Sequence, residues 1–186
     1  VQSELQGLNE QQLDFTSKSP DWAHWSIRRQ VSHMANCVYF WLFGRWGELL
    51  WENASPDPEL IEIALSRHDH DRMLDPSRYR SISSLLRMLN RSYDLINEVA
   101  GRETVNSISK KKLTLRLDLD SKVGTSEENQ HQLWELFAPF HSRGITQDQL
   151  DPHVWTFTLE ATLKHLYFEQ LSHLRTIQRL KKKQGL

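Results

Sequence analysis

Two residues suited to acid–base or metal chemistry, Glu169 and His173, occur in a C-terminal stretch whose apolar spacing predicts a helix. His173 falls at the centre of the apolar stripe, and Glu169 lies one turn away on the same face. An ionised glutamate is rarely buried alone, because the loss of its hydration costs several kcal/mol. A cation or a basic side chain must therefore meet Glu169 inside the fold. The stripe itself consists of Leu159, Leu163, Leu166, Ile177 and Leu180.

His33 is the candidate third member of this group, on a long helix expected from about Ser26, its N-cap, to about Trp51. Two ligands four residues apart on one helix, with a third from a facing helix, form a common kind of metal site in helical bundles. Two neutral imidazoles and one carboxylate also leave coordination positions open for water or substrate. The pattern predicts a divalent metal site made of His33, Glu169 and His173.

A metal-free interpretation stays open beside this one. A single histidine such as His33 is more often a core side chain that is hydrogen-bonded to a neighbour. Glu169 between His33 and His173 could form a buried acid–imidazolium cluster in a non-catalytic binding or assembly module. His165 lies roughly 12 Å from His173 along the helix axis, at about 1.5 Å per residue. We therefore expect His165 behind the ligands or on the surface.

Other candidate residues rank lower. The run from His68 to Asp71 holds metal-binding residue types, but consecutive side chains rarely converge, which favours a solvated polar stretch. Cys37, one turn from His33, could be a ligand or a nucleophile, but a single buried cysteine more often packs inertly in the core. In a catalytic site, Cys37 and Asn36 would form part of the pocket wall. The chain contains no glycine-rich phosphate loop, nucleophile elbow or CxxC pair, so nucleotide-dependent and serine-hydrolase chemistry lack support.

Composition narrows the class of protein. The 186 residues suit one domain spanning 1–186, and 23 lysines and arginines nearly balance 24 aspartates and glutamates. Such a balance favours neither nucleic acid nor a membrane surface as a partner. The single cysteine fits a reducing compartment, and no membrane-spanning run or signal peptide is visible. We expect a cytoplasmic protein.

The apolar periodicity predicts a mostly helical chain. The stretch 102–125 differs, because KLTLRLDLD alternates leucines with polar residues and predicts a strand or extended arm. We expect an all-α fold, an up-and-down four-helix bundle with one extra helix and a short β-like arm. A second copy of the chain could cover the leucines of the arm, which favours a homodimer, whereas an arm folded over its own bundle would be a lid. Helices are expected near 2–16, 26–51, 59–67, 82–100, 126–142 and 156–183, with Pro58 in the first turn of the third.

Two segments resemble a known family. WSIRRQVSHM (25–34) resembles the WS-x-R-E-x-x-x-H signature of the DinB/YfiT-like superfamily, and TLEATLKHLYFEQLSHLRTIQRL (158–180) resembles its last helix, which carries an H-x-x-x-H pair. The resemblance implies a four-helix bundle and a divalent metal held by three histidines. It also implies a hydrolase, or a transferase that uses a low-molecular-weight thiol, acting on an electrophilic small molecule. The ligands carried over are His33, Glu169 and His173. Glu169 departs from the family, which has histidine there, and this leaves the choice among Zn, Ni, Mn and Fe open.

Overall fold

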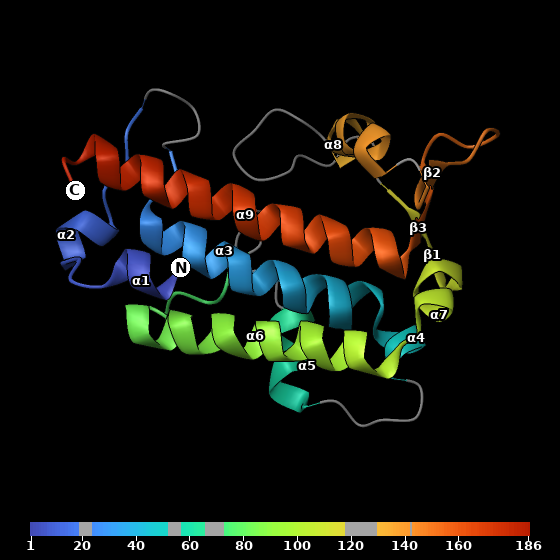
Figure 1. The fold of residues 1–186 in the computed structure, drawn as a ribbon, viewed down its shortest axis with the longest axis horizontal. Coiled ribbons are helices and arrows are strands. Elements are labelled where there is room, and N and C mark those ends of the chain that lie inside the picture. Colours follow the sequence, from blue (N-terminus) through green and yellow to red (C-terminus); the bar gives the residue numbers. More distant parts are fainter. Residues whose placement is uncertain (19–23, 52–56, 66–72, 118–129, 142) are drawn as a thin grey trace.

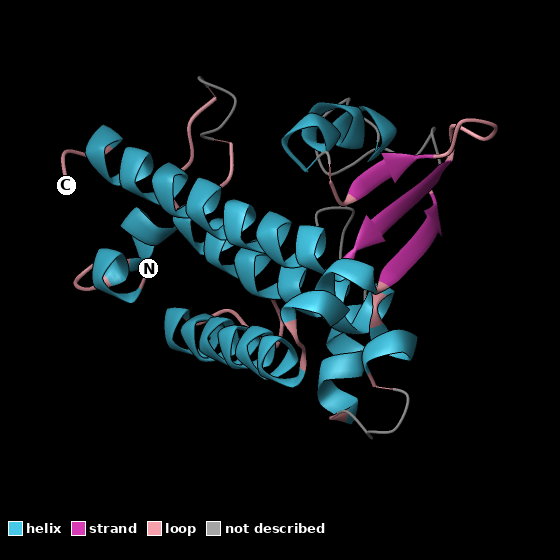
Figure 2. Ribbon diagram, turned by 45° about the vertical axis from the view of Figure 1, so that its right-hand side comes forward, coloured by secondary structure: helices cyan, strands magenta, loops and turns pink. Residues whose placement is uncertain are grey.

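The computed structural model describes residues 1–18, 24–51, 57–65, 73–117, 130–141 and 143–186. Within these ranges the chain is mostly helical, with a small antiparallel sheet at one end (Figure 1 and Figure 2). The helices are α1 (Gln2–Leu5), α2 (Glu10–Leu13), α3 (Ile27–Tyr39), the π-helical η2 (Phe40–Arg45), α4 (Gly47–Leu50), α5 (Pro58–Leu65), α6 (Ile82–Arg102), α7 (Val105–Lys110), α8 (Gln130–Phe137), the 3-10 helix η3 (Ala138–His141) and α9 (Leu159–Lys183). The strands are β1 (Lys112–Arg116), β2 (Ile145–Gln147) and β3 (Val154–Thr158).

Three long helices, α3, α6 and α9, lie side by side, and α3 packs against both of the others (Figure 1). Each begins with a hydroxyl cap that accepts a backbone N–H of the first turn: Ser26 for α3, Ser81 for α6 and Thr158 for α9. The prediction that Ser26 starts the second long helix is confirmed, as is the place of Pro58 at the start of α5. Nearly all of α3 is buried, because helices cover it on more than one side.

Buried polar side chains tie the three helices to one another. The Tyr39 hydroxyl on α3 donates to the Met88 carbonyl on α6 (2.7 Å). Gln170 on α9 donates to the Met34 carbonyl on α3 (3.0 Å) and accepts from the Tyr93 hydroxyl on α6 (3.1 Å). Because a buried polar group is costly without a partner, these bonds restrict the relative positions that the helices can adopt.

The sheet has the order β1-β3-β2, and both neighbours of β3 run antiparallel to it. Phe157 on β3 faces Leu113 on one side and Ile145 on the other. β3 leads directly into α9, and the Thr158 backbone N–H donates to the Gly144 carbonyl (2.7 Å). The sheet therefore fixes the start of the helix that carries Glu169 and His173.

The strands correct the all-α expectation. Residues 145–147 and 154–158 form strands where a loop and a helix start were expected, so α9 begins at Leu159. The expected arm contains helix α7 and strand β1, and β1 pairs with β3 of the same chain. Leu113 and Leu115 of its leucine row are half-buried against the core of the same chain, which weakens the reason for expecting a homodimer through the arm. Residues 118–125 of the expected arm lie outside the described residues.

The first helix is also different from the prediction. The stretch 2–16 forms the two short helices α1 and α2, separated at Gly7, whose φ of +80° is the left-handed conformation that ends helices. The helix expected at 126–142 is α8 continued by η3; residues 126–129 and 142 lie outside the described residues. Among the described helices, none combines the length and apolar character that a membrane crossing needs.

Candidate metal centre

His33 on α3 and Glu169 and His173 on α9 converge. One nitrogen or carboxylate oxygen from each residue lies within 4.8 Å of the others. His33 is 8% exposed, and the side chains of Glu169 and His173 are 18% and 15% exposed. The three residues predicted from spacing therefore form one group, largely withdrawn from solvent, at the interface between two long helices.

Glu169 has an imidazole beside each of its carboxylate oxygens. The His173 Nε2 atom lies 3.2 Å from Oε2, and the His165 Nε2 atom lies 3.4 Å from Oε1. Burial by itself raises the pKa of Glu169, but the hydrogen bond from His173 and the charges on His165, His33 and His173 outweigh it and lower the pKa to about 2. The group thus contains a carboxylate that is ionised at neutral pH.

Gln30 and Trp25 hold the histidine rings in place, and the sequence patterns did not single out Gln30. The His173 Nδ1–H donates to Gln30 Oε1. The Trp25 ring stacks on His173 at 6.1 Å between centroids and contacts His33 edge-on at 4.9 Å. A signal for Gln30 was available: it lies three residues before His33 on the same apolar face of α3, where a polar side chain requires a partner.

His165 lies behind the three residues, which confirms one of its two expected places and excludes the surface. It is 3% exposed, and its Nε2 atom lies beside Glu169 Oε1. Aromatic rings surround its imidazole. Their centroids lie 4.7 Å away for Trp134, 5.3 Å for Phe137, 5.9 Å for His141 and 6.2 Å for Trp41.

Cys37 and Asn36 are buried at 2% and 4% exposure, next to the turn of α3 that carries His33. Burial of this kind fits the inert packing expected for Cys37. The run from His68 to Asp71 lies outside the described residues.

The donor set fits a divalent ion. Two imidazoles and a carboxylate suit Zn, Ni, Mn and Fe alike, and three protein ligands leave further coordination positions for water or substrate. With Nδ1–H of His173 held by Gln30, the ring has Nε2 to offer, on the side where Glu169 lies.

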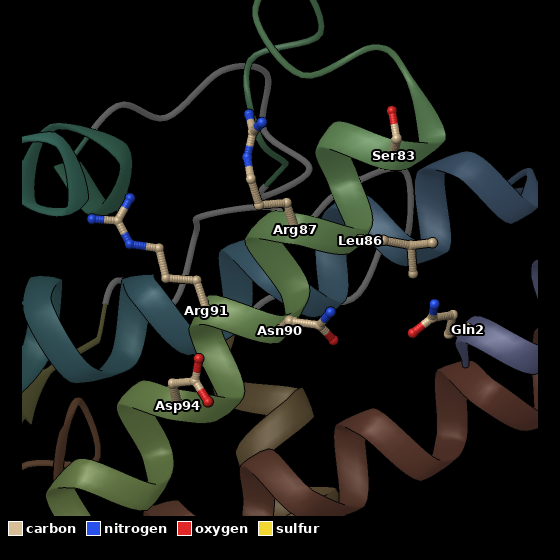
Figure 3. A pocket seen from close by; sticks show the side chains of 7 residues that line it. All are labelled: Gln2, Ser83, Leu86, Arg87, Asn90, Arg91 and Asp94. Carbon is tan, nitrogen blue, oxygen red and sulfur yellow. The ribbon is translucent and has the colours of Figure 1, made fainter.

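A separate open hollow of about 520 Å³ lies along α6 beside Gln2 (Figure 3). None of the three candidate ligands lines it. Among its charged lining residues, Arg91 is already paired with Asp57 and Glu59. The lining consists of Gln2, Ser83, Leu86, Arg87, Asn90, Arg91 and Asp94.

Comparison with known proteins adds no relative from which the site could be assigned. No protein-family model matches the chain, and no curated protein and no solved structure matches it significantly. The resemblance to the DinB/YfiT-like superfamily therefore rests on residues 25–34 and 158–180 alone, and His33, Glu169 and His173 are a candidate centre defined by their geometry.

Proposed function

We propose that the chain is a divalent-metal-binding protein of the DinB/YfiT type, with a four-helix-bundle core, that acts as a hydrolase or thiol-dependent transferase on an electrophilic small molecule. The observation that carries the proposal is the convergence of His33, Glu169 and His173 within 4.8 Å at a helix interface that is largely withdrawn from solvent. Three ionisable groups are costly in such a place unless they bind something.

Each residue would have a separate role at such a metal centre. His33 and His173 offer ring nitrogens, and Glu169 offers a carboxylate charge that offsets one charge of the cation. Trp25 covers the two rings and limits the access of water to them. A bound divalent ion supplies Lewis-acid chemistry, which lowers the pKa of a water molecule or a thiol enough to make it a nucleophile near neutral pH.

A second candidate function follows from the two contacts of Glu169. With His173 beside Oε2 and His165 beside Oε1, the carboxylate can be satisfied by protonated imidazoles without a metal. In that case the group is a structural ion cluster, and the protein is a non-catalytic binding or assembly module.

Metal-dependent stability separates the two functions. Protein purified without chelator is stripped, and its melting temperature is measured with and without Zn²⁺, Ni²⁺, Mn²⁺ or Fe²⁺. A metal at about 100 times its Kd stabilises the folded state by about 2.7 kcal/mol, which for a chain of this length is a rise of roughly 5–10 °C. Glu169→Gln keeps the size of the side chain but removes its charge, so it should erase most of the rise.

Glu160→Gln is the matched control, because Glu160 lies on the same helix and its partner is the exposed Lys164. This variant should keep the full rise. An equal rise in Glu169→Gln would point to another site, and His68 and His70 would be tested first. No rise in the wild type, together with a loss of metal-free stability in Glu169→Gln, would favour the structural ion cluster.

A further inference from the structure

Gln30 occupies a position on α3 that would suit an apolar residue. It is 3% exposed, and its neighbours on that face, Ile27, Val31 and Met34, are fully buried. A buried amide requires hydrogen-bond partners, since leaving its oxygen or nitrogen unpaired is costly. The amide lies between Trp25 and His173: its Nε2 is 3.5 Å from the Trp25 carbonyl, and its Oε1 accepts the Nδ1–H of His173.

This contact determines which nitrogen of His173 is available. An amide oxygen accepts hydrogen bonds but cannot donate one, so Nδ1 of His173 must carry a proton. The proton that Nε2 donates to Glu169 is then the one that a metal would displace, which leaves the lone pair of Nε2 for the ion while Nδ1 stays protonated. Nε2 is the nitrogen 3.2 Å from Glu169 Oε2, on the side where the three candidate ligands converge.

The contact also fixes the direction of the ring. His173 is stacked on Trp25 with an angle of 6° between the two planes, and a 180° flip about its Cβ–Cγ bond would preserve this stacking. The bond from Nδ1 to Gln30 opposes that flip, because the flip would exchange Nδ1 with Cδ2 and Nε2 with Cε1 and so break the contacts with Gln30 and Glu169.

We propose that Gln30 is the positioning residue of this centre: it holds the Nδ1–H tautomer and the orientation of His173, so that Nε2 faces the metal. The inference rests on the proposed metal site. Residues that orient a ligand in this manner typically change metal affinity about 10- to 100-fold when they are replaced.

The test compares three variants in the full-length protein, with Zn²⁺ affinity measured by chelator competition and Co²⁺ absorption as a probe of ligand geometry. Gln30→Met keeps the volume and removes the acceptor, so we expect an affinity about 10- to 100-fold lower and an altered Co²⁺ spectrum. Gln30→Glu keeps an acceptor for Nδ1–H and should bind at least as tightly as the wild type. Gln170→Met is the matched control: Gln170 is also a buried glutamine between α9 and α3, but it bonds Met34 and Tyr93 and not a candidate ligand.

Gln170→Met should therefore lose stability and keep its affinity and spectrum, which separates positioning from a general loosening of the helices. Nitrogen NMR of the His173 ring gives a second readout, because Nδ1 should carry the proton in the wild type and in Gln30→Glu. If Gln30→Met binds as tightly as the wild type, or Gln30→Glu as weakly as a folded Gln30→Met, the inference is overturned and the metal site stands. If the wild type binds neither ion, the proposed function itself fails and the inference with it.

Discussion

The Glu169 carboxylate contacts two histidines on α9: His165, four residues before it, and His173, four residues after it. The arrangement follows from helix geometry, since residues at this spacing lie on one face. Because His173 also contacts His33, the two oxygens of Glu169 differ: Oε2 lies beside His173 of the candidate centre, and Oε1 lies beside His165.

His165 should be needed to keep Glu169 in place. His165→Phe fits the surrounding aromatic rings but removes the nitrogen 3.4 Å from Glu169 Oε1. Leaving a buried carboxylate oxygen without its donor should lower the free energy of unfolding by about 1–3 kcal/mol. Urea denaturation of the metal-free protein measures this. His165→Gln restores an N–H donor and should recover part of the loss, whereas a Phe variant as stable as the wild type would show that Oε1 does not depend on His165.

At this scale the sequence predicts which residues meet but not what orients them. The spacing of Glu169 and His173, and the place of His33 on an apolar helix, are enough to group the three, because helical periodicity fixes which face each one occupies. The contact of Gln30 with His173 depends on how α3 and α9 are placed along each other, which no local pattern encodes.

Among the elements, the segment between α6 and β1, which contains α7, is stabilised by the buried carboxylate of Glu103. The Glu103 side chain, 7% exposed, follows the last residue of α6 and binds Lys111, and it accepts from the Ser107 hydroxyl (2.5 Å). Burial raises the pKa of Glu103, but the hydrogen bonds from Lys111 and Ser107 outweigh it and bring the pKa below its usual 4.5.

Glu103→Gln should therefore destabilise the protein in a pH-dependent way. The folded-state pKa is lowered, so the stabilisation is fully present above pH 4.5 and is lost as the pH falls through the folded-state value. We expect a loss of about 1.5–3 kcal/mol at pH 7 and a smaller difference from the wild type at pH 3, measured by urea unfolding. Glu98→Gln, which breaks an exposed pair with Arg102, should cost less than about 1 kcal/mol at either pH. A Glu103→Gln loss that did not shrink at low pH would contradict the assignment.

The long helices and the strand β1 were predicted from local patterns, whereas the strands β2 and β3 were not. The helices α3, α6 and α9 carry strong apolar periodicity and capping residues, both of which are local signals. β2 has three residues, too few for a pattern, and VWTFT of β3 runs without a break into the helix that follows. Its partner β1 lies more than 40 residues away in sequence, as in the pair Leu113 and Phe157. Strand pairing at this separation depends on tertiary structure.

For the whole molecule, the homodimer stays a prediction. The surface that now supports it lies on α8, η3 and α9 and not on the arm. Exposed apolar side chains occur on α8, η3 and α9, and the Phe137–Phe168 ring contact (5.5 Å) joins α8 to α9. An exposed apolar area of this kind commonly marks a protein interface. The side chains concerned are Leu136, Phe140, Tyr167, Phe168 and Leu171.

Light scattering at tens of micromolar protein should give a mass near twice 22.0 kDa if a second copy covers this surface. Replacing Phe140 and Tyr167, which are 78% and 66% exposed, by serine should then shift the protein toward the monomer without loss of the fold. Val105→Ser is the control, because Val105 is 86% exposed but lies on α7. A wild-type mass near 22.0 kDa would show that the chain is monomeric and that the leucines and aromatic rings do not form a dimer contact.

The π-helical turn η2 inserts one extra residue between α3 and α4. The Trp46 N–H donates to the Trp41 carbonyl, five residues back (2.9 Å), so this turn contains one residue more than a turn of α-helix. In a regular α-helix, one additional residue would turn all later side chains by about 100° about the helix axis. Upstream of η2, Gln30 meets α9 at His173; downstream, the Trp46 indole N–H meets α9 again at Thr162 (3.1 Å). The extra residue in η2 changes the rotation of the helix, so that Gln30 before it and Trp46 after it both face α9. The part of the helix with Gln30 and the part with Trp46 therefore each keep a side-chain hydrogen bond to α9, one on either side of η2.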